Sequence, residues 1–95
     1  MPVWFETPAY HGARVRGLAV VSAHLMADTT EELAALARAI GLKPEWIQNP
    51  GTAKEHFDLM GEGMCSKAEM AGAQRVTRTE FVERYRAKKA KEPKP

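Results

Sequence analysis

Two histidine–aspartate pairs have the residue types and the spacing that could carry chemistry. His24 and Asp28 are separated by three residues, and His56 and Asp58 by one. Two imidazoles and two carboxylates can bind a divalent transition metal ion and leave a coordination position where water is activated. The chain has neither an HExxH nor an HxH motif. A metal-dependent hydrolase or nuclease is therefore the alternative interpretation, with a divalent metal ion as its cofactor.

The leading interpretation is a site for a small anionic ligand. Protonated imidazole attracts phosphate, and Ser66 and Lys67 lie where a short helix is expected to begin, with free backbone N–H groups. Trp46 could stack on a base. We expect a protein that binds or sequesters a phosphorylated or nucleotide-like ligand, with no cofactor and no catalysis. Seven residues are expected to form the site: His24, Asp28, Trp46, His56, Asp58, Ser66 and Lys67.

Each of these residues also has a purely structural interpretation. Asp28 and Ser66 both precede a glutamate by three residues, which is the pattern of a helix N-cap. Either histidine can be hydrogen-bonded to a backbone carbonyl, and His56 and Asp58 can simply orient each other. Trp46 is of a type that often packs in a core. The sequence alone leaves these alternatives open.

The elements that must position these residues are expected to be short strands that alternate with helices. An apolar run at 18–22 is expected to be a buried strand. The first helix begins at Asp28 or Thr29, each followed by a glutamate three residues later, and ends near Ile40, before Gly41. The other expected elements are strands at 3–6, 45–48, 55–60 and 74–78, a loop at 7–17 that could close over the domain, and helices from Ser66 and from Thr77 or Thr79.

This alternation predicts an α/β fold with a single small domain at residues 1–87. We expect a largely parallel sheet of three to four strands, flanked by about three helices. In such a sheet the carboxyl ends of the strands share one edge with the N-termini of the helices. The candidate residues are expected to converge at that edge.

Residues 88–95 are expected to be a basic, disordered tail. Residues 84–95 hold six basic side chains and one acidic one, whereas the net charge of the whole chain is only +2. The rest of the chain is therefore acidic. Binding of nucleic acid or of another partner through the tail ranks last for that reason.

Composition narrows the remaining choices. No apolar run approaches the ~20 residues that cross a bilayer, and the N-terminus does not resemble a signal peptide, so we expect a cytoplasmic protein without membrane contact. The single cysteine, Cys65, excludes an intramolecular disulfide and a thiolate metal cage within one chain. Because small domains often complete a site across a subunit interface, a homodimer or larger homo-oligomer is expected.

The order of the motifs along residues 18–80 resembles that of a known family. The segment AHLMADTTEELAALARAIGL is followed by Trp46, then HFDL, then SKAEMAGAQRVT. This order is similar to that of small bacterial and phage proteins catalogued as domain of unknown function 4031. The resemblance implies two aspartates at the end of the first strand, where this chain offers at most Glu6, and an arginine where it has Ala68. If the family has an acidic, metal-assisted chemistry, this chain lacks part of it, which favours binding over hydrolysis.

Overall fold

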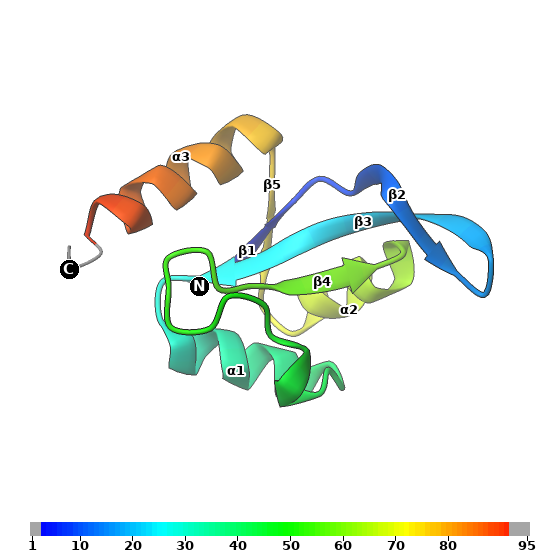
Figure 1. The fold of residues 1–95 in the computed structure, drawn as a ribbon, viewed down its shortest axis with the longest axis horizontal. Coiled ribbons are helices and arrows are strands. Elements are labelled where there is room, and N and C mark those ends of the chain that lie inside the picture. The colour runs from blue at the N-terminus through cyan, green and yellow to red at the C-terminus, as the bar shows by residue number, and fades with distance from the viewer. Residues whose placement is uncertain (1–2, 92–95) are drawn as a thin grey trace.

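The sheet is organised around one long strand in the computed structural model, which describes residues 3–91 (Figure 1). This strand is β3 (Leu18–Ala27). Strands β1 (Val3–Glu6) and β2 (Ala9–Val15) pair antiparallel with successive stretches of β3. β1 and β2 therefore run one after the other in the same direction along β3, and the chain reverses between β2 and β3 without an intervening helix.

Two further strands complete the sheet. β4 (Phe57–Met60) pairs antiparallel with β3, and β5 (Gln74–Val76) pairs parallel with β1. Among the described residues the β1–β5 pair is the only parallel one. The expected small α/β domain is confirmed, but the expected largely parallel sheet of three to four strands is wrong: the sheet has five strands and is mostly antiparallel.

The segment expected to be a loop at 7–17 explains most of this difference. It contains β2, and Arg16 and Gly17 join β2 to β3 with φ of 53° and 81°. Two successive residues with positive φ fit the type I′ turn of a two-residue hairpin. Arg16 carries no signal for such a turn, since a positive φ is uncommon outside glycine, asparagine and aspartate. The buried strand expected at 18–22 is also wrong at its start, because Leu18 is 72% exposed.

Helices cover both faces of the sheet. α1 (Thr30–Ala39) and α2 (Glu62–Met70) lie on one face, and α3 (Arg78–Ala90) lies on the other (Figure 1). A 3₁₀ helix, η1 (Pro44–Trp46), takes the place of the strand expected at 45–48. The arrangement has three layers, with the sheet in the middle.

The alternation of side chains along β1 divides the core between the two faces. Val3 and Phe5 belong to the larger cluster, beneath α1 and α2, whereas Trp4 packs with Phe81 of α3. All four are at most 7% exposed. Because successive side chains of a strand point to opposite faces, Glu6 shares the face of Trp4. A buried carboxylate is thereby placed beside α3.

Local signals place α1 correctly and α2 incorrectly. Thr29 caps α1, and its hydroxyl oxygen accepts a hydrogen bond from the backbone N–H of Glu32 at 3.2 Å. For α2, the cap expected at Ser66 is wrong. Gly61 precedes the helix with a φ of 89° and starts it at Glu62, so Ser66 lies well inside it.

α3 begins where the sequence predicts. The hydroxyl oxygen of Thr77 accepts from the backbone N–H of Glu80 at 3.1 Å. The helix then continues to Ala90, so the domain boundary expected at residue 87 falls inside it. The end of the expected tail, 92–95, lies outside the described residues. None of the helices within residues 3–91 combines the length and the apolar character that a bilayer crossing requires.

Candidate metal centre

Three of the expected site residues meet on the α3 face of the sheet: His24, His56 and Asp58. His24 of β3 lies directly opposite Asp58 of β4, and opposed residues of an antiparallel pair share a face. His56 precedes Asp58 by two residues, which places both on one side, as the alternation in the sequence predicts. The two imidazole centroids are 5.2 Å apart. One ligand atom from each of the three residues lies within 4.8 Å of the other two.

Glu6 fixes the orientation of His24. Its Oε1 accepts from the backbone N–H of His24 at 2.8 Å and forms a short hydrogen bond with His24 Nδ1. Its Oε2 accepts from a guanidinium nitrogen of Arg78 at 2.7 Å. Glu6 is 1% exposed, and all of its hydrogen-bonding partners are donors. With Nδ1 of His24 engaged by the carboxylate, Nε2 is the ring nitrogen left to face a ligand.

The charges of this cluster shift two pKa values in opposite directions. Burial alone would raise the pKa of Glu6, but hydrogen bonds from His24 and the positive charges of His24 and Arg78 outweigh burial and lower it. The hydrogen bond to Glu6 raises the pKa of His24 against the effect of burial, and the negative charge of Asp58 adds to the increase. A metal ion at His24 must therefore compete with a proton at a higher pH than for a free histidine.

His56 is oriented by the backbone instead. Its Nδ1 lies 2.7 Å from the carbonyl oxygen of Lys54. Because a carbonyl only accepts, Nδ1 carries the proton, and Nε2 presents its lone pair in the neutral ring. That Nε2 lies 3.5 Å from Oδ1 of Asp58. The other carboxylate oxygen of Asp58 accepts from Nε2 of Gln48 at 2.6 Å.

This arrangement resembles the two layers of a protein metal site. Each imidazole has its Nδ1 bonded to an acceptor, which fixes the tautomer and leaves Nε2 for the ion, and such outer partners accompany nearly all metal-binding histidines. The carboxylate of Asp58 is likewise held by a donor. Two imidazoles and one carboxylate would leave positions open for water or substrate.

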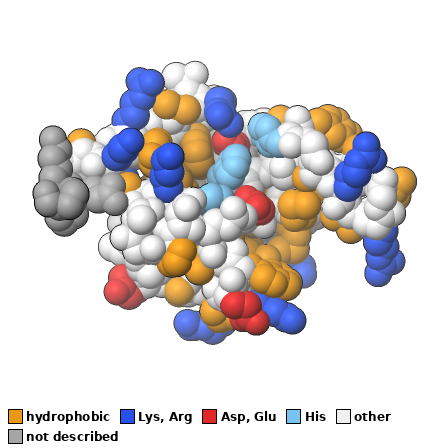
Figure 2. All heavy atoms as spheres, in the orientation of Figure 1, with side chains coloured by type: hydrophobic (Ala, Val, Ile, Leu, Met, Phe, Trp, Pro, Cys, Tyr) orange, Lys and Arg blue, Asp and Glu red, His pale blue; other side chains and the backbone are white. Residues whose placement is uncertain are grey.

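A cleft of about 410 Å³ opens beside the two histidines. Figure 2 shows histidine side chains near the middle of the molecular surface that it draws, with carboxylates next to them and Lys and Arg side chains around. The cleft is lined by cations, Lys54 and Arg78, and by aromatic rings, Phe81 and Tyr85. The hydroxyl oxygen of Tyr85 is buried and has no hydrogen-bond partner among the described residues. A polar ligand could supply that partner.

A comparison with known proteins identifies the family but not an activity. The model of the family described as "Protein of unknown function (DUF4031)" matches residues 10–88, most of the chain. The chain belongs to that family. The resemblance drawn from the sequence is thereby confirmed. No curated protein and no solved structure matches the chain, so the function of this DUF4031 domain has to be argued from its geometry.

The other expected site residues do not join the cluster. Asp28 is exposed and lines a different cleft, at the start of α1. Ser66 and Lys67 are exposed within α2, on the opposite face of the sheet from α3. Trp46 is 52% exposed and lines a third cleft, of about 290 Å³, which also includes Asp58. The convergence expected at the edge of a parallel sheet fails because the sheet is antiparallel where these residues attach.

Three contributors to the site have little or no signal in the sequence. Glu6 stands at the end of an apolar strand, which is a weak hint, but its contact with His24 depends on the pairing of β1 with β3. Lys54 acts on His56 through its backbone carbonyl, which no side-chain motif can reveal. Arg78 reaches Glu6 across 72 positions of the chain. These contacts follow from the fold.

Proposed function

We propose that this domain binds a divalent transition metal ion through Nε2 of His24, Nε2 of His56 and a carboxylate oxygen of Asp58, and uses it to hydrolyse a phosphate ester. The observation that carries the proposal is that an acceptor holds Nδ1 of each imidazole, while the two rings and the carboxylate of Asp58 lie close enough together to share one ion. For a histidine with a purely structural role, one hydrogen bond at Nδ1 is sufficient. Here two imidazoles that are each held at Nδ1 also lie close to the carboxylate of Asp58, and together the three side chains form the proposed ligand set.

The lining of the cleft supports phosphate as the group acted upon. Arg78 is 65% exposed and Lys54 is exposed, and both border the cleft with the histidines. A divalent ion held by His24, His56 and Asp58 would supply Lewis acidity and lower the pKa of water enough to provide a nucleophile for a phosphate ester near neutral pH. Cations next to the ion stabilise the charge that develops on the phosphoryl oxygens.

Titration calorimetry with zinc and with manganese at pH 7.5 tests the metal site. His56→Ala and Asp58→Asn should each weaken zinc binding by at least about tenfold, since each removes a ligand. The matched control is His11→Ala, because His11 is exposed and its ring centroid lies 6.0 Å from that of His24 without belonging to the ligand set. Equal weakening by the control would overturn the site.

Hydrolysis of bis(4-nitrophenyl) phosphate by the zinc-loaded and manganese-loaded protein tests the reaction. The proposal expects turnover that disappears with Asp58→Asn and persists with His11→Ala. Zinc binding without any turnover of this diester or of a monoester such as 4-nitrophenyl phosphate would leave a metal-binding protein and refute the hydrolase.

A second candidate is metal-free binding of a phosphorylated or nucleotide-like ligand in the same cleft. The raised pKa of His24 favours it, because the protonated ring would add a positive charge beside Arg78. Trp46 lines the separate cleft that includes Asp58, and its exposed ring offers a surface on which a base could stack. The two candidates differ in pH dependence: phosphate affinity should rise as the pH falls below 7 in this case, whereas metal affinity should fall.

Assembly into a homodimer or larger homo-oligomer is proposed as well. Its support is the β2–β3 hairpin, where Tyr10 and Leu18 are 73% and 72% exposed. Exposed apolar side chains mark a contact surface where they are contiguous, and Leu18 pairs across the hairpin with Val15, which is 43% exposed. Sedimentation velocity tests this assembly by comparing the wild type with the double variant Tyr10→Ser, Leu18→Ser. A wild type that is monomeric at micromolar concentration would reject the homo-oligomer.

A further inference from the structure

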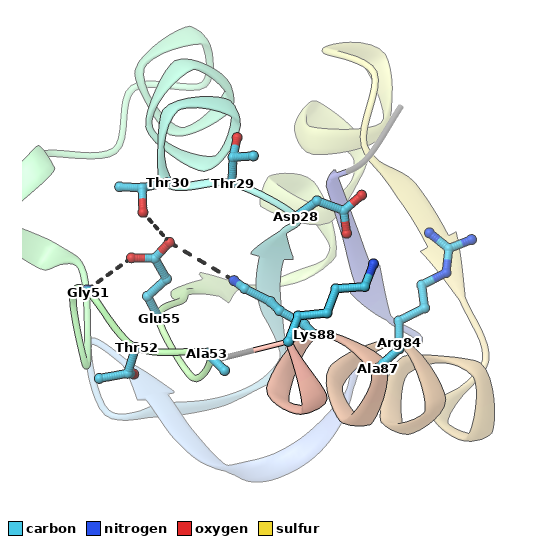
Figure 3. Close-up of a pocket in the computed structure, with 11 residues that line it drawn as sticks. Asp28, Thr29, Thr30, Gly51, Thr52, Ala53, Glu55, Arg84, Ala87 and Lys88 are labelled. Atoms are coloured by element: carbon cyan, nitrogen blue, oxygen red, sulfur yellow. Dashed lines mark hydrogen bonds and ion pairs between the residues drawn. The ribbon is translucent and has the colours of Figure 1, made fainter. Parts of the chain in front are cut away.

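We propose that a second cleft, lined by α3 and by the loop 49–55, binds a phosphate-type dianion independently of the metal centre. It is the largest of the three clefts described, at about 500 Å³, and Figure 3 shows its lining. None of its lining residues belongs to the ligand set of the metal centre.

Three cations of α3 border this cleft. Arg84, Lys88 and Lys91 are spaced by four and three residues, and side chains at this spacing share one face of a helix. Figure 3 shows Lys88 extending from α3 towards Glu55, whereas Arg84, on the same helix, extends on the side away from Glu55. The basic end of the chain is thereby part of a defined concave surface in the described region.

Lys88 has no hydrogen-bond acceptor among residues 3–91. Its side chain is 14% exposed, its Nζ is buried, and it donates no hydrogen bond to any described residue. An ammonium group has three N–H donors, and leaving them unpaired away from water is costly. Oε2 of Glu55 lies at 4.0 Å, which is an ion pair but too long for a hydrogen bond. An oxygen atom from a bound ligand would satisfy this donor.

Glu55 is already engaged by other donors. It accepts from Oγ1 of Thr30 at 2.6 Å and from the backbone N–H of Gly51 at 3.1 Å (Figure 3). These bonds hold the carboxylate in place and limit its approach to Lys88. The carboxylate of Glu55 therefore attracts the ammonium group of Lys88 without accepting a hydrogen bond from it, and the N–H groups of Lys88 stay available to a ligand.

The charges select a ligand with several negative oxygens. Three cations line the cleft against two carboxylates, Asp28 and Glu55. Both terminal guanidinium nitrogens of Arg84 already donate, one to Oε1 of Gln74 at 2.9 Å and the other to Oε2 of Glu80 at 2.6 Å. A guanidinium has five N–H groups, so donors remain for a ligand. A phosphate dianion carries about twice the negative charge of a carboxylate and has more acceptor oxygens, so it matches the three cations Arg84, Lys88 and Lys91 better than one carboxylate ligand does.

Calorimetric titration of the full chain with inorganic phosphate, in the presence of a chelator that removes metal ions, tests the site. Lys88→Met keeps the apolar stem of the side chain and removes its charge, and should weaken phosphate binding about tenfold or more. The matched control is Lys89→Met, because Lys89 is the exposed neighbour and lines none of the three clefts. It should change the affinity less than about twofold.

Glu55→Gln provides a test with the opposite sign. The substitution removes the negative charge beside Lys88 and keeps an oxygen acceptor for Gly51, so phosphate affinity should rise. Should Lys88→Met fail to fold, this rise still decides the case. Equal losses in both lysine variants, an unchanged or lower affinity in Glu55→Gln, or absence of phosphate binding at millimolar concentration would each overturn the proposal. Loss of phosphate binding in His56→Ala would also overturn it, by assigning the phosphate to the other cleft.

Discussion

Glu6→Gln is the perturbation that tests the core of the candidate site. Glutamine keeps the shape and one acceptor oxygen but removes the negative charge that both His24 and Arg78 contact. A hydrogen bond to a charged group contributes about 1.5–3 kcal/mol. Water can solvate the freed partners, because His24 is 41% and Arg78 65% exposed, so the lower part of that range applies. We expect a loss of about 1–2 kcal/mol in unfolding free energy at pH 5.5.

The pH dependence of this loss distinguishes the charge of Glu6 from its shape. The lowered pKa of Glu6 stabilises the fold above the ordinary glutamate pKa, and this contribution is lost as the pH falls through the lowered value. The raised pKa of His24 stabilises the fold below about pH 6.5, and this contribution is lost as the pH rises through the raised value. The unfolding free energy of the wild type should therefore exceed that of Glu6→Gln most strongly between about pH 4.5 and 6.5.

Urea unfolding at pH 5.5 and 8.5 measures this difference, and the histidine signals in an NMR titration report the pKa of His24 directly. The matched control is Glu55→Gln, since Glu55 is also buried but its side chain bonds to Thr30 and Gly51 rather than to a histidine. The control should show no comparable change between the two pH values. An unaltered pKa of His24 in Glu6→Gln, or equal losses at both pH values, would refute the role given to Glu6.

Three further predictions follow from the same structure. Zinc affinity should fall by roughly tenfold per pH unit as the pH drops below the raised pKa of His24; calorimetry from pH 8 to pH 5.5 checks this, and a flat profile would exclude both histidines as ligands. Burial raises the pKa of the Cys65 thiol to about 11, so Ellman's reagent should react slowly with native protein and rapidly in guanidinium; fast native reaction would contradict the packing of α2. Deleting residues 88–95 should lower the melting temperature by about 5 °C relative to deletion of 92–95, because it shortens α3 and removes the side chain of Lys88, which is only 14% exposed; equal melting temperatures in a thermal scan would show that this end of α3 adds nothing.

Elements with local signals were predictable from the sequence. The cap at Thr29 and the end of α1 near Ile40, before Gly41, appear in the structure as expected. The shared side of His56 and Asp58 was predictable too, because a strand period of two involves neighbours in the chain. Each of these depends on residues that lie within one or two turns, or a few positions, of each other.

Features set by long-range pairing were not predictable. The hairpin of β2 and β3 turns at Arg16, a residue without turn preference, and its absence from the prediction changed the expected sheet from antiparallel to parallel. That error moved Asp28, Ser66 and Lys67 into a shared site that the structure does not form. The contact of His24 with Asp58 came instead from strand pairing. Register between strands distant in sequence is decided by the packing of the whole core.

The ligand set also bears on which metal ion the centre would select. Both oxygens of Glu6 are occupied, one by His24 and the other by Arg78, so this carboxylate orients a ligand and leaves Asp58 as the only carboxylate ligand in the set. Magnesium and calcium require mostly oxygen ligands, whereas imidazole nitrogen suits zinc, copper, iron and nickel. A site of two imidazoles and one carboxylate should therefore bind zinc at least about a hundredfold more tightly than magnesium. Competition of the two ions, followed by calorimetry, would show it, and preference for magnesium would mean that the histidines are not ligands.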